Sequence, residues 1–68
     1  MQKGQTVTWD WGQGTASGEV VDRFTRKVTR TLKGSEVTRD GSGKDAALLI
    51  RQDDGDEVLK LESEVRKG

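Results

Sequence analysis

Short apolar runs, separated by turns that contain glycine or aspartate, dominate this sequence, and none of them repeats with the period of a helix. Residues 5–11 alternate instead, with Val7, Trp9 and Trp11 on one side and polar residues between them. Alternation of apolar and polar residues is typical of a half-buried β-strand. The pattern therefore predicts an all-β chain.

The stretch after this first strand predicts a loop and then a second strand. Residues 12–18 are rich in glycine and small polar residues, which is typical of a flexible loop. Residues 19–26 follow as a strand in which Val20 and Val21 point to opposite faces. We therefore expect this strand either to be covered on both sides at one end or to carry a β-bulge.

A hairpin is predicted over residues 28–39, with Gly34 and Ser35 at the centre of a type II′ turn. The resulting register brings opposite charges, apolar residues and threonines face to face, as Lys33 with Glu36, Leu32 with Val37 and Thr31 with Thr38. Each such pair stabilises a hairpin by roughly 0.2–1 kcal/mol. A turn placed one residue earlier would lose this matching.

The same register places Arg30 opposite Arg39. Two guanidinium groups at opposite positions repel each other unless an acid or an anionic ligand lies between them. Arginine is suited to forked contacts with carboxylate or phosphate groups. Two interpretations follow: the arginines are a clamp for an anionic ligand, or they form a bridge to the acidic residues among residues 53–57.

The last third of the chain predicts a further hairpin. Asp54 and Gly55 are a strong turn signal, and they join a run at residues 46–52 to a strand at residues 57–61. At most one helical turn follows, with Ser63 as its candidate N-cap. Five or six short strands with tight turns indicate a small, strongly bent barrel that closes on itself.

Composition limits both the size and the chemistry of the protein. The 68 residues form one domain at most, over residues 1–68. Histidine and cysteine are absent, which removes the commonest general base, metal ligand and strong nucleophile. We therefore predict a binding module and not an enzyme, without a metal ion or another cofactor. Neither a disulfide nor a signal peptide nor a membrane span is indicated, so the expected location is the cytoplasm.

The zero net charge conceals a partition along the chain. Residues 23–44 contain seven basic and two acidic residues and carry a net charge of +5, so the rest of the chain carries −5. The basic part is either a surface for a polyanion or the internal partner of the acidic part. Because charged surface residues of small domains usually have no external partner, internal pairing is the favoured interpretation.

Aromatic residues are few: two tryptophans and one phenylalanine. Trp9 lies in the middle of the first strand, so we expect it in the core, where a large ring dominates the burial of a small domain. Trp11 ends the strand beside glycines. It is therefore either a second core residue or a half-exposed ring at the rim that contacts a ligand.

Three blocks in this order, KGQTVTWDWGQGTASGEVV, VTRTLKGSEVTRDGS and LIRQDDGDEVLKLESEV, resemble the TUDOR domain family of hypervirulence-associated proteins. The resemblance runs from Lys3 to Val65 and implies an SH3-like, Tudor-type barrel. Tudor-type domains of other families bind methylated lysine or arginine in a cage of aromatic rings, by cation–π attraction. Trp11 matches the place at the end of the first strand where such a cage contributes a ring, and no Tyr is present to complete it.

Two functional hypotheses follow. In the first, the rim around Trp11 and the basic hairpin of residues 26–39 hold nucleic acid or another anionic partner, with Arg26, Arg30 and Arg39 as the contacting arginines. In the alternative, the domain binds a protein or peptide through the Trp11 surface or a strand edge, and a methylated lysine or arginine is one ligand of that class. The sequence leaves the natural ligand and the oligomeric state open.

Overall fold

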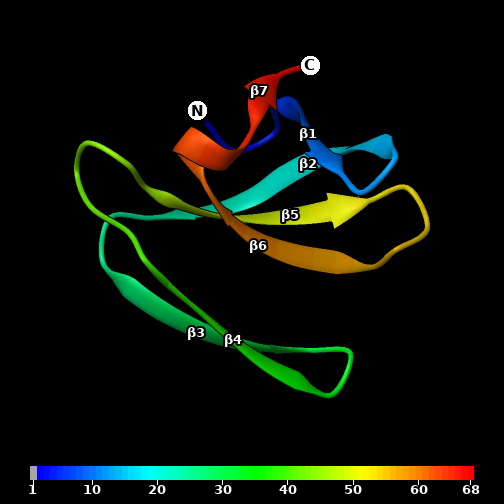
Figure 1. Ribbon diagram of the computed structural model, residues 1–68. Coiled ribbons are helices and arrows are strands. Elements are labelled where there is room, and N and C mark those ends of the chain that lie inside the picture. Colours follow the sequence, from blue (N-terminus) through cyan, green and yellow to red (C-terminus); the bar gives the residue numbers. More distant parts are fainter. Residues whose placement is uncertain (1) are drawn as a thin grey trace.

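The computed structural model describes residues 2–68, which form two antiparallel β-sheets and one short 3₁₀ turn (Figure 1). In chain order the elements are β1 (Thr6–Trp11), β2 (Gly14–Phe24), β3 (Lys27–Leu32), β4 (Ser35–Asp40), β5 (Ala47–Gln52), β6 (Glu57–Leu61), the 3₁₀ turn η1 (Glu62–Glu64) and β7 (Arg66–Lys67). The larger sheet has the order β6-β5-β2-β1-β7, and β3 and β4 form the second sheet. The predicted class, a small all-β barrel-like fold with at most one helical turn, is confirmed.

Strand β2 connects the two halves of the larger sheet, because it pairs with β1 along its first part and with β5 along its second. Its 11 residues would span about 33 Å if the strand were straight, at roughly 3.3 Å per residue. The molecule measures only 28 Å along its longest axis. The strand therefore has to bend.

A register shift between Val20 and Asp22 marks a β-bulge in β2, which is one of the two alternatives expected there. Without a bulge, Val20 and Phe24 would share a face, because alternate residues of a strand do so. With the bulge, Val20 packs in one hydrophobic cluster and Phe24 in the other. One strand thus serves two cores.

The two hydrophobic clusters lie on opposite faces of β5. The first contains Val7, Trp9, Val20, Leu48, Ile50 and Val65. The second contains Phe24, Val28, Ala47 and Leu59, with Leu32, Val37, Leu49 and Leu61 partly buried against it. Because successive residues of a strand point to opposite faces, β5 supplies both clusters, and the β3–β4 hairpin covers the second (Figure 1).

The prediction of a loop at residues 12–18 is wrong. Only residues 12–13 turn, and β2 already begins at Gly14, which pairs with Trp11. Gly12 has a φ of 46°, a left-handed conformation that favours glycine and allows the tight turn. The small residues that follow pair with β1 and lengthen β2, and the local composition gave no sign of that pairing.

The predicted central hairpin is confirmed as β3–β4, but its turn lies one residue earlier than predicted. Lys33 and Gly34 occupy the centre, with φ of 51° and 77°. Two positive φ values characterise a type I′ turn, whose twist matches that of the flanking strands. The predicted side-chain matching is replaced by another register, in which the hydroxyl oxygens of Thr29 and Thr38 lie 2.9 Å apart.

Arg30 and Arg39 are therefore not opposite each other, which corrects the predicted pair. Arg30 faces Val37, and Arg39 faces Val28. Each residue of β3 meets a partner two positions earlier in β4 than predicted, and a shift of two keeps every side chain on its expected face. Both arginines still lie on the face that covers the core, at diagonal positions.

The predicted hairpin at Asp54 and Gly55 is confirmed as the connection between β5 and β6, with Gly55 at a φ of 90°. Ser63 is not the N-cap of the helical turn, because Leu61 holds that position in η1. Ser63 instead donates from its backbone nitrogen and its hydroxyl to the carboxylate of Asp45, both at 2.8 Å. These bonds fasten η1 to the loop before β5.

The substitution Gly41→Ala tests how closely the loop between β4 and β5 packs. A Cβ at Gly41 would lie 2.5 Å from the carbonyl oxygen of Phe24 and 2.7 Å from the amide nitrogen of Ala47. Both are backbone atoms, so we expect the free energy of unfolding, measured by urea titration, to fall by about 1–3 kcal/mol. Gly43→Ala is the matched control, because a Cβ there meets no described atom within 4 Å. Equal losses from both substitutions would contradict the packing.

Candidate functional site

The two tryptophans of β1 have different environments. Trp9 is 4% exposed within the first core cluster, which confirms its predicted place. Trp11 is 61% exposed at the end of the strand, so of its two predicted environments the rim is the one found. Its ring lies over Gly14, where an added Cβ would meet ring atoms at 3.7–3.9 Å. The glycine thus gives the ring room beside the backbone, and the outer side of the ring is open to a ligand.

An open depression of about 330 Å³ adjoins Trp11, and we call it the Trp11 site. It is lined from the β1–β2 hairpin and the β5–β6 turn by Trp11, Thr15, Ala16, Ser17, Gln52, Asp53 and Asp54. Asp53 and Asp54 form no ion pair with any residue of the described chain. Asp54 accepts a hydrogen bond from the backbone nitrogen of Asp56 at 2.9 Å, which fixes its position in the turn. The exposed ring therefore has negative charge beside it.

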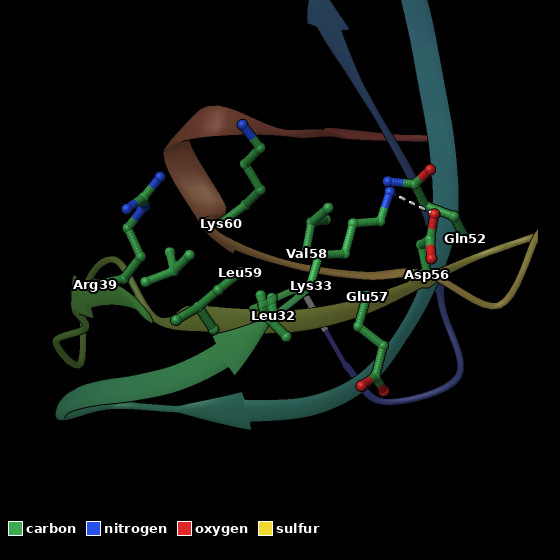
Figure 2. Close-up of a pocket in the computed structure, with 10 residues that line it drawn as sticks. Leu32, Lys33, Arg39, Gln52, Asp56, Glu57, Val58, Leu59 and Lys60 are labelled. Atoms are coloured by element: carbon green, nitrogen blue, oxygen red, sulfur yellow. Dashed lines mark ion pairs between the residues drawn. The ribbon is translucent and has the colours of Figure 1, made fainter. Parts of the chain in front are cut away.

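A second depression, of about 280 Å³, runs between the β3–β4 hairpin and β6, and we call it the hairpin groove. Figure 2 shows Leu32, Val58 and Leu59 along it, with an ion pair between Lys33 and Asp56 near Gln52 at one end and Arg39 and Lys60 at the other. Gln52 lines both this groove and the Trp11 site. The two depressions therefore adjoin each other.

The ion pair of Lys33 with Asp56, at 2.6 Å, joins the tip of the β3–β4 hairpin to the β5–β6 turn. The ammonium group holds the pKa of Asp56 below its usual range through a hydrogen bond, and the carboxylate in turn raises the pKa of Lys33. The acidic turn thus contacts the basic hairpin at its tip. Arg30 and Arg39, for which a bridge to residues 53–57 was the second interpretation, have no ion pair with that turn within the described chain.

Arg39 pairs instead with η1, where its Nε lies 3.3 Å from Oε1 of Glu64. Arg26 and Arg30 lie over the ring of Phe24, with their Cζ atoms 5.3 and 5.0 Å from its centroid. Neither of these two arginines has an ion pair with any residue in 2–68. The two guanidinium groups that the structure brings together are thus those of Arg26 and Arg30, and not the predicted pair.

The four residues predicted to bind a ligand do not share one surface. Trp11 pairs with the first residue of β2, whereas Arg26 and Arg30 lie over the ring of Phe24, the last residue of that strand. Arg39 faces Val28 in the hairpin and pairs with Glu64 of η1. Asp53 and Asp54, which were predicted as part of a turn and as candidate bridge partners of Arg30 and Arg39, are the charged residues that do lie beside Trp11.

Another exposed ion pair lies at the β7 edge of the larger sheet. Arg66 of β7 donates from both terminal nitrogens to the two carboxylate oxygens of Asp10, each at 3.0 Å. This forked contact lowers the pKa of Asp10 and raises that of Arg66. Within residues 2–68, no three acidic side chains gather in a way that could hold a metal ion. The same residues include no helix with the length and apolar character needed to cross a bilayer.

The substitution Lys33→Met tests the bridge between the hairpin and the turn. We expect the pKa of Asp56 to rise towards the ordinary aspartate value of about 4, because the ammonium partner is gone. A carboxyl group with a lowered pKa stabilises the fold above its unfolded pKa and loses that contribution as the pH falls through its folded pKa. The stability difference between wild type and variant should therefore be present at neutral pH and vanish in acid.

Carboxyl-carbon NMR titration measures the pKa of Asp56 in both proteins. Lys27→Met is the matched control, because Lys27 lies on the same hairpin and has no ion pair with any described residue. An Asp56 pKa that is the same in wild type and Lys33→Met would show that the bridge is absent in solution.

Comparison with known proteins agrees with this architecture. A family model described as the TUDOR domain of hypervirulence-associated proteins matches residues 4–65, nearly the whole chain. Searches of curated proteins and of solved structures gave no match. Tudor-type domains are small binding modules, and this is the functional class that the family suggests for the chain. The protein therefore belongs to the family of the TUDOR domain of hypervirulence-associated proteins.

Proposed function

We propose that this domain is a protein-interaction module that holds a cationic side chain of its partner against Trp11. The observation that carries the proposal is the exposed ring of Trp11 beside the carboxylates of Asp53 and Asp54. This surface favours a protein or peptide, the alternative hypothesis from the sequence, over a polyanion. Phosphate groups would be repelled by the two carboxylates at this end of the barrel.

Lysine and arginine side chains suit this site on two grounds. A cation over the face of a tryptophan gains about 0.5–1 kcal/mol at an exposed position. Asp53 and Asp54 can accept charge-assisted hydrogen bonds from the same cation. Thr15 and Ser17 add hydroxyl groups to the wall of the depression. The site therefore has an apolar face for the alkyl stem of the ligand and acceptors for its charged end.

A longer ligand would continue into the hairpin groove. The groove adjoins the Trp11 site at Gln52 and has an apolar floor at Leu32 and Val58. Its far end carries Arg39 and Lys60. This surface favours a partner segment that has a basic residue at one end, apolar residues in the middle and an acidic residue at the other end. Either chain direction of the partner satisfies this order.

Methylation of the cation is not required by this arrangement. Trp9 and Phe24 are buried, so Trp11 is the one exposed ring of the three aromatic residues. A single ring is no cage, whereas the carboxylates favour an unmodified ammonium or guanidinium group that donates hydrogen bonds. Nucleic-acid binding by Trp11 together with the basic hairpin stays a prediction, and the separation of the two along β2 counts against a single shared ligand.

Titration with two short blocked peptides tests the proposal, one with a single arginine and the other with glutamate at that position. The indole N–H signals of Trp11 and Trp9 report on the rim and the core in the same NMR spectrum. We expect the arginine peptide to shift the Trp11 signal and the backbone signals of residues 52–54, and the glutamate peptide to shift neither. Trp11→Ala should weaken binding about two- to fivefold, the equivalent of a cation–π contact at an exposed site.

Asp53→Asn removes charge from the Trp11 site, and Glu36→Gln removes the same charge from the outer face of the β3–β4 hairpin. The first should weaken binding and the second should not. Both residues are exposed, so both variants should fold. The proposal is contradicted if the two variants bind equally well, or if the glutamate peptide shifts the same signals as the arginine peptide.

A further inference from the structure

Unpaired positive charge remains at the end of the barrel opposite Trp11. Three basic residues of the segment 23–44 pair with acidic residues in the C-terminal part of the chain: Arg23 with Glu62, Lys33 with Asp56 and Arg39 with Glu64. The other four have no ion pair with any residue that the structure describes: Arg26, Lys27, Arg30 and Lys44. Internal pairing, the favoured interpretation of the charge partition, therefore accounts for only part of it.

The backbone gathers three of these four residues. Arg26 and Lys27 lie at the start of the hairpin, and Lys44 lies in the loop that leads from β4 to β5. The backbone nitrogen of Gly41 donates to the carbonyl oxygen of Arg26 at 3.2 Å. This bond holds that loop beside the β2–β3 connection (Figure 1). Positive charge from two separate segments thus collects at one end of the molecule.

The ring of Phe24 provides the surface over which Arg26 and Arg30 lie, within this basic end of the molecule. Its side chain is buried, and the guanidinium carbons of Arg26 and Arg30 lie 5.3 and 5.0 Å from its ring centroid. Each guanidinium group has five N–H donors. Arg30 donates from Nη1 to the carbonyl oxygen of Thr29 at 3.1 Å, which orients the group and leaves further donors for a ligand.

The acidic residues on neighbouring segments are directed elsewhere. Asp22, two residues before Phe24, accepts a hydrogen bond from the backbone nitrogen of Arg23. Asp40 faces Lys27 in the ladder of the hairpin, and the carboxylate of Asp45 accepts two hydrogen bonds from Ser63. No carboxylate of the described chain forms an ion pair with Arg26 or Arg30.

We infer that Arg26 and Arg30 form a second binding site, for phosphate groups, independent of the Trp11 site. Both guanidinium groups lie over the ring of Phe24, so an anion placed between them can accept hydrogen bonds from each. The forked donors of arginine match the oxygens of phosphate. The phosphate can be a free ion or part of a nucleic-acid backbone, because the same donors recognise both.

NMR titration of the free domain separates these sources. One arm uses inorganic phosphate at constant ionic strength set by sodium chloride, and the other uses a short oligothymidylate. We expect phosphate to shift the side-chain Nε–H signals of Arg26 and Arg30 and the backbone signals around Gly41. The Trp11 indole signal should not move. Tighter binding of the oligonucleotide, with an affinity that falls as salt rises, would identify nucleic acid as the source.

The double substitution Arg26→Gln and Arg30→Gln should weaken phosphate binding about tenfold or more, since hydrogen bonds to charged groups are lost. Lys27→Gln is the matched control, because it removes one charge from the other face of the hairpin and should have a much smaller effect. Arg30→Lys keeps the charge and removes the forked donors, so it should also weaken binding. This conservative variant keeps the test decisive if the double variant fails to fold. The inference is overturned if phosphate shifts none of these signals, or if Lys27→Gln weakens binding as much as the double substitution.

Discussion

The bulge in β2 is the constraint on which the remaining structure depends. It turns Val20 to one hydrophobic cluster and Phe24 to the other, so that a single long strand can be shared by two cores. The same bend lets β2 pair with β1 near its start and with β5 near its end, within a molecule of only 28 Å. A 68-residue chain without a disulfide has few other ways to bury enough apolar surface.

The two ends of β2 differ in electrostatic character. At the first end, Trp11 lies open beside Asp53 and Asp54. At the second end, Phe24 carries two arginines that have no acidic partner in the described chain. A net charge of zero therefore conceals two poles. The proposed functions follow from this separation, with a cationic side chain at one pole and a phosphate group at the other.

Local patterns predicted the features that depend on local chemistry. Alternation predicted the buried position of Trp9, the glycine at position 55 predicted a hairpin, and the neighbouring valines predicted the bulge as one alternative. The prediction for the turn of the central hairpin was wrong because it weighed cross-strand side-chain pairs and not the twist of the strands, which favours a type I′ turn at Lys33 and Gly34. Lys33 also contacts Asp56, 23 residues away in the sequence, and no local pattern reveals that contact.

The composition of the Trp11 site could not be predicted from the sequence for the same reason. Asp53 and Asp54 come beside Trp11 only because β5 pairs with β2, with Gln52 opposite Gly18. Nothing near Asp53 in the sequence specifies that pairing. The prediction of the basic site failed in a different way. It identified the arginines, but it did not identify Phe24, the ring over which two of them lie in the folded chain.

The central claim of this account is that the exposed ring and the paired arginines belong to opposite poles. A NOESY spectrum of the free protein in solution tests it most directly, through contacts of the Trp11 indole protons. The account predicts cross-peaks from the indole to Gly14 and to the turn at residues 53–54, and from the Phe24 ring to Arg26 and Arg30. Cross-peaks from the Trp11 indole to side chains of residues 26–30 would contradict it.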